Sequence, residues 1–514
     1  MPAPALFDVG PHAPCPVPFN IAAYVTAQAA HLPDKPALLV LGAPGEVLQH
    51  LTHSEIRAAI LRTAGGLKAA GIQKRDRVLL RLPSSSEFPI LFYALTALGA
   101  LPVPVSAQLT PTEVADVVAD LAPALICLGS GLDLPATKGV KVLGPDALTA
   151  LRGAEPAEPV ATMPDDPAFM VYTSGTGGRP KGVLHAHRTA WARRMMWQGW
   201  YGLGPEDRVL HAGAFNWTYT LGAGLTDPWA AGATALIHAG AAHRGIWADL
   251  AAAHGATIFA AVPGVYRQLL ASDADVTTAF AGLRHGLSAG EALPAALAKA
   301  WTARTGKPLY EALGMSEIST YISFSASIPP VPGRVGVPQR GRRVAILPDE
   351  GTDEPVARGQ DGFLAVSKRD PGLMLGYWNR PRETKDCFRG EWFITGDRAR
   401  MHDDDTITYL GRADDVMTSG GFRVSPAEVE AALLSHPGIS EVGVSEAEVR
   451  PGVRIIVARY VPSGAPVAET VLASHCADRL ARYKCQRAFE PVQTLPRSSN
   501  GKLLRRLLRS APIP

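Results

Sequence analysis

The sequence predicts an α/β protein in two parts, a large N-terminal domain of parallel sheets with packed helices and a small α+β C-terminal domain. Short apolar segments with strand character alternate with Ala- and Leu-rich helical segments, a pattern typical of βα units. The chain has 514 residues, which is more than one ordinary domain needs. A capped helix start at Ser425 indicates a second unit toward the C-terminal end.

Apolar patterns place the main elements of the large domain. The predicted helices include Ser54–Ala70 and Pro294–Thr305. The predicted buried strands are Val78–Leu82, Ala124–Leu128, Phe169–Tyr172, Ala233–His238 and Thr257–Val262. Because these strands alternate with helices, we expect most strand pairs to be parallel.

The apolar segment 88–105 could be mistaken for a membrane span. Pro89 lies near its start, and Pro102 and Pro104 interrupt its end. We therefore predict a buried helix that runs into a buried strand.

The small domain is predicted over residues 414–514, after a large domain of residues 1–413. Ser425 can cap a helix, and Glu428 stands where it would complete a capping box. The helix should end before Pro437.

Composition excludes several classes of protein. Hydrophobic residues make up 47% and charged residues 19%, which indicates a globular enzyme. The 50 Lys and Arg nearly balance the 47 Asp and Glu, so neither nucleic acid nor a membrane is expected as a partner. The five cysteines lack metal-ligand spacing, and the N-terminal residues lack a signal-peptide pattern. We expect a cytoplasmic monomer or homodimer with reduced thiols.

A Gly-, Ser- and Thr-rich segment follows the predicted strand Phe169–Tyr172. It reads Thr173-Ser174-Gly175-Thr176-Gly177-Gly178-Arg179-Pro180-Lys181-Gly182. The glycines let backbone N–H groups crowd around a phosphate, the hydroxyls add donors, and Lys181 adds a positive charge. A Walker A loop is disfavoured because Pro180 precedes the lysine and Gly182 follows it. Taken alone, the segment fits a phosphate loop and a flexible surface loop equally well.

The order of residues in this segment resembles the phosphate loop of the ANL superfamily, which comprises acyl-CoA synthetases, amino-acid adenylation domains and firefly-type luciferases. Four further blocks match in the same order, so the resemblance covers most of the chain. They read Tyr310-Glu-Ala-Leu-Gly-Met-Ser-Glu317, Trp392-Phe-Ile-Thr-Gly-Asp397, Gly411-Arg-Ala-Asp-Asp415 followed by Gly420-Gly-Phe-Arg423, and Pro496-Arg-Ser-Ser-Asn-Gly-Lys502.

The resemblance implies an ATP-dependent acid–CoA ligase, most similar to the short- and medium-chain and benzoate-type enzymes. Such an enzyme joins a carboxylic acid to the α-phosphate of ATP, releases pyrophosphate, and passes the acyl group from the adenylate to a thiol. The implied cofactors are ATP, Mg²⁺ and coenzyme A.

The resemblance also implies roles for individual residues. Lys502 would supply positive charge during adenylation, Ser316 would contact the α-phosphate, and Glu317 would hold Mg²⁺. Asp397 and Arg412 would bind the ribose. The other implied nucleotide- and CoA-binding residues are Thr173, Ser174, Gly175, Thr176, Lys181, Gly290, Glu291, Gly421 and Arg423.

Asp414 matches the family's hinge, which implies that the small domain is mobile. Between the two half-reactions it would turn, withdraw Lys502, and bring the Gly420–Gly421 loop to line a tunnel for the pantetheine thiol.

The acyl pocket is implied at five positions, which are Phe215, Trp217, Tyr219, His187 and Gly314. Acetate-type enzymes have a tryptophan at the position of Gly314. Glycine there leaves room, so the acid is expected to be larger than acetate, whether medium-chain, alicyclic or aromatic.

Two other functions stay open. The first is an adenylating enzyme that loads a carrier-protein thiol, although no carrier domain follows Pro514. The second is a non-catalytic protein that binds ATP or an acyl-adenylate, although such a protein need not keep Lys502, Glu317 and Asp397 together.

Some features carry a simpler interpretation. His185 and His187 would share one strand face, but no third metal ligand is evident. Each pocket aromatic could equally pack in the core. Gly177 and Leu313 depart from the family, which commonly has threonine and an aromatic residue there, yet neither change removes a group needed for the chemistry.

Overall fold

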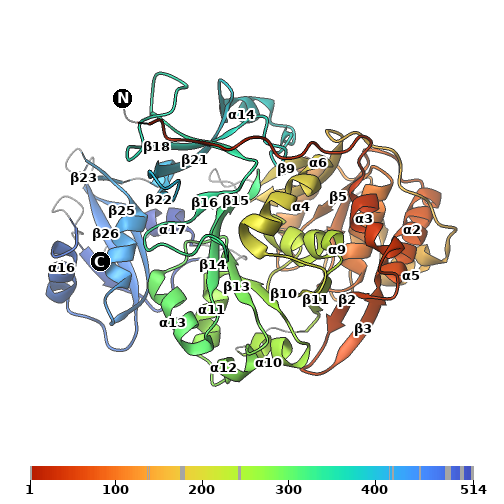
Figure 1. The fold of residues 1–514 in the computed structure, drawn as a ribbon, viewed down its shortest axis with the longest axis horizontal. Helices are drawn as coiled ribbons and strands as arrows, with labels where there is room; N and C mark the ends of the chain where they lie inside the picture. Colours follow the sequence, from red (N-terminus) through yellow and green to blue (C-terminus); the bar gives the residue numbers. More distant parts are fainter. Residues whose placement is uncertain are drawn as a thin grey trace.

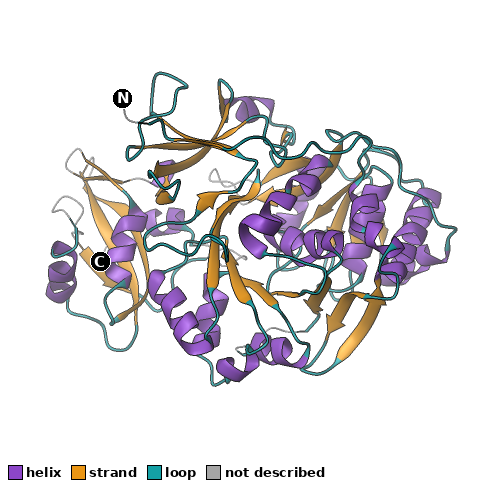
Figure 2. Ribbon diagram, viewed as in Figure 1, coloured by secondary structure: helices purple, strands orange, loops and turns teal. Residues whose placement is uncertain are grey.

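The computed structural model has a large part and a small part lying side by side (Figure 1). The structure describes residues 3–135, 137, 139–173, 180–240, 243, 245–415, 417–419, 422–450, 453–480, 488–497 and 503–510. Helices pack on the sheets of the large part, and the C-terminal part carries its own sheet and helices (Figure 2). The predicted two-part α/β fold is confirmed.

A nine-stranded sheet is the centre of the large part. Its strands, in spatial order, are β16 (Val337–Pro338), β15 (Ser319–Ser323), β14 (Leu309–Met315), β13 (His285–Ala289), β12 (Ile258–Ala261), β10 (Arg208–His211), β11 (Thr234–His238), β2 (Pro36–Leu41) and β3 (Val47–Thr52). The pairs from β14 through β2 are parallel, and the pairs at both edges are antiparallel. The inner strands are buried on both faces, which explains why they read as continuous apolar runs.

Three smaller sheets complete the large part. A parallel sheet has the order β5 (Leu101–Pro104), β4 (Arg77–Arg81), β6 (Leu125–Leu128) and β7 (Lys141–Leu143). An antiparallel sheet has the order β19 (Gly376–Tyr377), β9 (Lys181–Ala186) and β8 (Pro167–Thr173). A second antiparallel sheet joins β1 (Leu6–Asp8), β17 (Arg343–Leu347), β18 (Asp361–Ser367), β21 (Trp392–Met401), β20 (Phe388–Arg389) and β22 (Ile407–Arg412). These antiparallel sheets accompany the predicted parallel ones.

The helices of the large part connect and cover these sheets. They are α1 (Ile21–Val25), α2 (His53–Ala69), α3 (Glu87–Ala97), α4 (Pro111–Leu121), α5 (Pro145–Ala150), α6 (Arg188–Ala192), α7 (Arg194–Met196), α8 (Thr218–Leu221), α9 (Asp227–Ala231), α10 (Ile246–Ala253), α11 (Pro263–Leu270), α12 (Val276–Ala279), α13 (Ala295–Thr305) and α14 (Pro381–Asp386). Their starts follow local chemistry, since reciprocal capping boxes at Thr52 and Thr110 begin α2 and α4.

The apolar segment 88–105 folds as predicted. It forms α3, which is buried nearly throughout, followed by the buried strand β5. Among the helices the structure describes, none is both long and apolar enough to cross a membrane.

The small part has its own apolar core. It contains α15 (Pro426–Leu434), α16 (Glu469–Ala477), α17 (Arg505–Ser510), the hairpin β23 (Met417–Ser419) and β24 (Phe422–Val424), and the sheet β25 (Ile439–Arg450), β26 (Val453–Pro462) and β27 (Ala488–Pro491). Helix α15 begins where predicted, because the Ser425 hydroxyl accepts the N–H of Glu428 at 3.4 Å. The predicted boundary after residue 413 stays a proposal, and a 3₁₀ turn over Ala413–Asp415 lies between β22 and β23.

Candidate active site

The phosphate-loop segment connects the two strands of a hairpin. Thr173 ends β8 and Lys181 begins β9, and the two residues face each other in the strand register. Ser174, Gly175 and Thr176 lie outside the described residues. The hairpin therefore holds Lys181 where the loop returns to the sheet.

Tyr377 brings Lys181 close to the acidic residue of the next block. Lys181 Nζ lies 5.2 Å from the centre of the Tyr377 ring, and the Tyr377 hydroxyl donates to Glu317 Oε1 at 2.7 Å. Burial, followed by the nearby Glu317 carboxylate, raises the pKa of Tyr377, so the phenol stays a donor. Lys181 Nζ also pairs with Glu383 Oε2 of α14 at 2.5 Å. Sequence reasoning missed Tyr377 and Glu383. The only local signal was the Gly376-Tyr377 pair, which follows a loop and resembles a local turn.

Glu317 lies in the turn of the β14–β15 hairpin, where Ser316 precedes it. Both residues are half-buried. The Glu317 backbone carbonyl accepts the N–H of Met374 at 2.8 Å, which joins this turn to the loop before β19. A half-buried carboxylate beside the phosphate hairpin is a suitable oxygen ligand for Mg²⁺, which usually takes one or two carboxylates together with substrate phosphates.

Asp397 and Arg412 meet because their strands pair. They stand opposite each other in β21 and β22. Arg412 Nη1 lies 3.3 Å from Asp397 Oδ1 and donates to the Thr395 carbonyl at 2.9 Å, while the Tyr409 hydroxyl lies 3.4 Å from the same Asp397 oxygen. Asp397 is almost fully buried. The two residues predicted to bind the ribose therefore form one fixed pair.

Gly290 and Trp217 form a close contact after β13. Gly290 has a φ of +95°, and a Cβ built on it would lie 2.4 Å from Cη2 of Trp217. Only glycine combines this conformation with the approach of an indole. Glu291, the next residue, receives a bond from Arg497 of the small part, with Nη1 3.1 Å from Oε1.

Gly314 is needed for a different reason from the one predicted. A Cβ built on it would lie 2.6 Å from the Ser319 carbonyl oxygen and 2.7 Å from Thr320 Cα. The β15 backbone thus fills the space beside Gly314, so this glycine permits the close approach of two strands at a bulge. Space beside Gly314 therefore does not support the prediction that the acid is larger than acetate.

Three other predicted pocket residues make core contacts. The Phe215 ring stacks on Phe88 at 4.8 Å, and the Tyr219 hydroxyl donates to the Leu287 carbonyl. His187 Nδ1 accepts the N–H of Ile21 at 3.1 Å, which fastens α1. Burial lowers the pKa of His187 to about 4, so its imidazole is neutral.

A small, partly open cavity near these residues was not predicted from the sequence. Its walls include His185 of β9, Arg193 before α7, Thr218 of α8 and Ser319 of β15. Arg193 forms a buried two-pronged ion pair with Asp227, with Nη2 2.6 Å from Oδ2. An acidic residue inside an otherwise apolar helical segment was the sequence signal for such a buried partner.

His185 and His187 have different neighbours. His185 stacks on Phe169, whereas His187 stands just before α6 and its Nδ1 accepts the N–H of Ile21. Within the part of the chain that the structure describes, no group of three or more His, Cys, Asp or Glu side chains could hold a metal ion.

The small part carries the remaining predicted residues. Gly421 and Lys502 lie outside the described residues, and only the backbone of Asp414 and Arg423 is described. Arg497, in the same block as Lys502, bridges Glu291 of the large part and Glu441 of β25.

Comparisons with known proteins find relatives over most of the chain. The AMP-binding enzyme family matches residues 25–378, and the AMP-binding enzyme C-terminal domain matches residues 428–502. The chain is 31% identical to a 3-hydroxybenzoate–CoA ligase of Aromatoleum sp. over 94% of this chain and 96% of that protein. It is also 31% identical to a benzoate–CoA ligase of Thauera aromatica over 90% of each chain.

A solved structure is similar over almost the whole fold. The crystal structure of an anthranilate–CoA ligase in complex with anthranoyl-AMP matches with a TM-score of 0.87 and 26% identity, covering 96% of this chain and 98% of that one. Sequence blocks, hairpin geometry and both family matches agree, and the chain belongs to the AMP-binding enzyme family, the adenylate-forming ANL superfamily that its motifs resemble.

Proposed function

We propose that the chain is an AMP-forming acid–CoA ligase that activates an aromatic carboxylic acid of the benzoate class. One observation carries the proposal: Tyr377 contacts both Lys181 of the phosphate hairpin and Glu317 of the β14–β15 turn. Attack of the carboxylate on ATP requires a positive charge and an acidic metal ligand close to each other. Tyr377 contacts the residue proposed for each role. The aromatic class is supported by the benzoate- and hydroxybenzoate-ligase relatives.

The chain's own residues would act mainly by position and charge. Both reactants are anionic, so attack of the carboxylate on the α-phosphate needs fixed donors between them. Lys181 would contact the pyrophosphate part of ATP, and the Asp397–Arg412 pair would hold the ribose. Glu317 would bind Mg²⁺, which when bound bridges phosphate oxygens and offsets their charge.

The small part is proposed to act in both adenylation and transfer of the acyl group to CoA. We propose that Lys502 supplies charge during adenylation and that Gly421 and Arg423 contact CoA after the small part turns about Asp414. Arg497 supports a close approach of this block, because it already touches Glu291, one of the implied nucleotide- and CoA-binding residues. A cytoplasmic location and a monomeric or homodimeric state remain part of the same proposal.

Pyrophosphate release, measured with and without CoA, tests the proposal. The acids would be acetate, octanoate, cyclohexanecarboxylate and benzoate, and wild type would be compared with Lys502→Ala. We expect benzoate to be preferred, CoA to speed turnover, and the variant to lose about a hundredfold or more in adenylation. Release with no acceleration by CoA would favour a carrier-protein acceptor, and no release with any acid would favour a binding protein.

A further inference from the structure

Glu383 of α14 lies between two cations beside the phosphate hairpin. Its Oε2 pairs with Lys181 Nζ at 2.5 Å, and its Oε1 lies 3.8 Å from Nε of Arg380, three residues earlier in the chain. Each oxygen of this carboxylate therefore faces a positive charge. The sequence motifs assign no role to Glu383, although its partner Lys181 belongs to the phosphate segment.

Arg380 is tied back to the phosphate hairpin. Its Nη2 lies 3.4 Å from Oδ1 of Asp120, which ends the α4 turn facing β8. The other oxygen of Asp120 accepts the hydroxyl of Tyr172, on β8, at 2.8 Å. These two bonds hold the Arg380 guanidinium at one place beside the hairpin, where it can keep Glu383 company.

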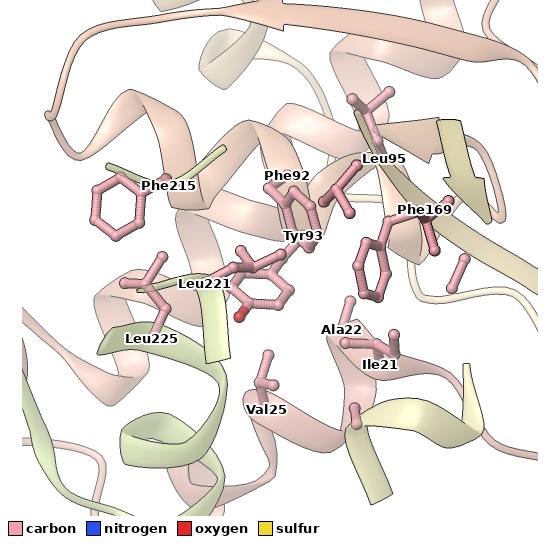
Figure 3. Close-up of a cluster of buried hydrophobic side chains, with 14 of the residues drawn as sticks. Ile21, Ala22, Val25, Phe92, Tyr93, Leu95, Phe169, Phe215, Leu221 and Leu225 are labelled. Carbon is pink, nitrogen blue, oxygen red and sulfur yellow. The ribbon is translucent and has the colours of Figure 1, made fainter. Parts of the chain in front are cut away.

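The base of the hairpin is anchored in the core. Phe169 of β8 packs on Phe92, with the ring centres 5.6 Å apart, inside a cluster of buried apolar side chains (Figure 3). Strand β9 pairs with β8 from Lys181, opposite Thr173, to its end. The backbone that carries Lys181 is thus held in place, and an exchange of partners by this residue involves its side chain.

The pair between Lys181 and Glu383 is open to such an exchange. The Lys181 side chain is 28% exposed and the Glu383 side chain is 43% exposed. An ion pair in contact with water contributes little net stability, so a more strongly charged anion can replace the carboxylate. A lysine ammonium suits the exchange, because it is a compact charge with three donors on a flexible stem.

We propose that Glu383 competes with the phosphates of ATP for Lys181 and thereby lowers the affinity for the nucleotide. The inference rests on the proposed function, in which Lys181 contacts the pyrophosphate part of ATP. When Lys181 turns to the phosphates, Arg380 remains beside the Glu383 carboxylate and compensates its charge. Glu383 is therefore a positioning residue, which acts on the nucleotide through Lys181.

Two other roles for Glu383 predict a change of the opposite sign. A residue that only preorganised Lys181 would strengthen ATP binding, and so would an additional oxygen ligand for Mg²⁺. Removing the Glu383 charge would then weaken ATP binding, whereas removing a competitor strengthens it. The sign of the change in ATP affinity separates these roles.

Isothermal titration calorimetry with Mg²⁺–ATP, without any carboxylic acid, measures this affinity in the absence of turnover. The variants are Glu383→Gln, which keeps the shape and removes the charge, and Glu383→Ala. Asp386→Asn is the matched control, because Asp386 is an exposed acid on the same helix. AMP is the control ligand, because it lacks the two phosphates that Lys181 would contact. Lys181→Met, alone and with Glu383→Gln, completes a double-mutant cycle.

We expect both Glu383 variants to bind ATP about two- to fivefold more tightly than wild type, which is the range of a partly exposed ion pair. Affinity for AMP should stay unchanged, and Asp386→Asn should match wild type with both ligands. Lys181→Met should weaken ATP binding. Adding Glu383→Gln to it should give no gain, because the competitor has lost the group for which it competes.

An unchanged or weaker affinity of the folded Glu383 variants for ATP would overturn the inference. An equal gain for AMP, or in the Lys181→Met background, would also overturn it, because the Glu383 charge would then act without Lys181. Thermal unfolding shows which variants are folded. The expected gain together with no pyrophosphate release from any acid would contradict the proposed function alone. Wild type that binds no ATP would contradict both.

Discussion

The ion pairs inside the large part differ from those at its junction with the small part. Arg342 and Asp370 are both fully buried, with exposed side-chain fractions of 0%, and Arg193 with Asp227 is nearly so. At the junction Arg497 keeps 30% of its side chain exposed while it contacts Glu291 and Glu441. The interior pairs are enclosed by other residues, whereas the junction pairs remain in contact with water.

Both interior arginines hold the same strand. Arg193 donates to the Ser319 hydroxyl, and Arg342 Nη2 donates to the Thr320 carbonyl at 3.1 Å. These residues begin β15, directly after the turn that carries Glu317. A buried charge that loses its partner is strongly unfavourable, so the hairpin is fixed in one position.

The junction is built from contacts that can exchange. Arg267 of α11 shares Glu441 with Arg497, at 3.4 Å and 2.6 Å from its two carboxylate oxygens. Figure 1 shows the small part beside α11 and α13. Partly exposed ion pairs contribute little net stability because water can replace either partner. The difference is that enclosed ion pairs hold the strand after the Glu317 turn, whereas partly exposed ion pairs of Arg497 join the small part to the large part.

The largest expected effect is the loss of an interior partner. Asp227→Asn leaves Arg193 buried without a counter-charge, so the free energy of unfolding should fall by about 3–5 kcal/mol. Chemical denaturation would measure it. Asp361→Asn is the matched control, because it breaks a half-exposed pair with Arg400 and should change stability by less than about 1 kcal/mol. Similar losses of unfolding free energy in both variants would contradict the difference between enclosed and half-exposed ion pairs.

Glu317→Gln should reduce activity and leave the fold intact. The amide keeps an oxygen for the Tyr377 hydroxyl but removes the charge proposed to bind Mg²⁺, so adenylation should fall about a hundredfold. Acid-dependent exchange of pyrophosphate into ATP measures this step. Glu391→Gln, in a partly exposed pair with Arg343, is the control and should retain activity. A Glu317→Gln enzyme with normal exchange would remove this residue from the site.

Glu311→Gln should change how stability depends on pH. Burial raises the pKa of Glu311 to about 8, opposed by the bond its Oε1 accepts from the Leu293 N–H. The folded protein therefore holds a proton that the unfolded chain releases near pH 4.5, so folding stability should fall as pH rises from about 5 to about 8.

The amide keeps the acceptor and cannot ionise, so the variant should gain about 1 kcal/mol or more over wild type at pH 8 relative to pH 5. Thermal unfolding across that range measures the difference. Parallel pH profiles for the two proteins would show that Glu311 is ionised in the fold.

Glu441→Gln should have the smallest effect and the most selective one. It weakens two junction pairs, so adenylation should slow by about two- to fivefold, while acyl transfer from synthetic acyl-adenylate to CoA stays unchanged. The difference should disappear at about 1 M salt, because exposed charges are then screened. Glu469→Gln, on α16 of the same part, is the control. Equal slowing of both half-reactions would show that the junction does not favour one of them.

The sequence by itself determined much of the local structure and the family to which the chain belongs. Apolar runs located β4, β6, β8, β11 and β12 to within about two residues, and the cap at Ser425 located α15. Such features depend on periodicity and on hydrogen bonds between near neighbours, which are properties of short segments. The five ordered motifs likewise identified the family before any geometry was known.

Only the tertiary structure decided which distant residues meet. Tyr377 lies 60 residues after Glu317, and Asp227 lies 34 residues after Arg193, yet each pair shares a hydrogen bond. Only the tertiary structure likewise showed what lies beside Gly314, which is the facing strand rather than an open pocket. No local pattern carries these contacts, because strand register and helix packing set them through the burial of surfaces far apart in the chain. The family and its reaction could therefore be predicted from the sequence, whereas the cavity and its buried charges could be found only in the folded chain.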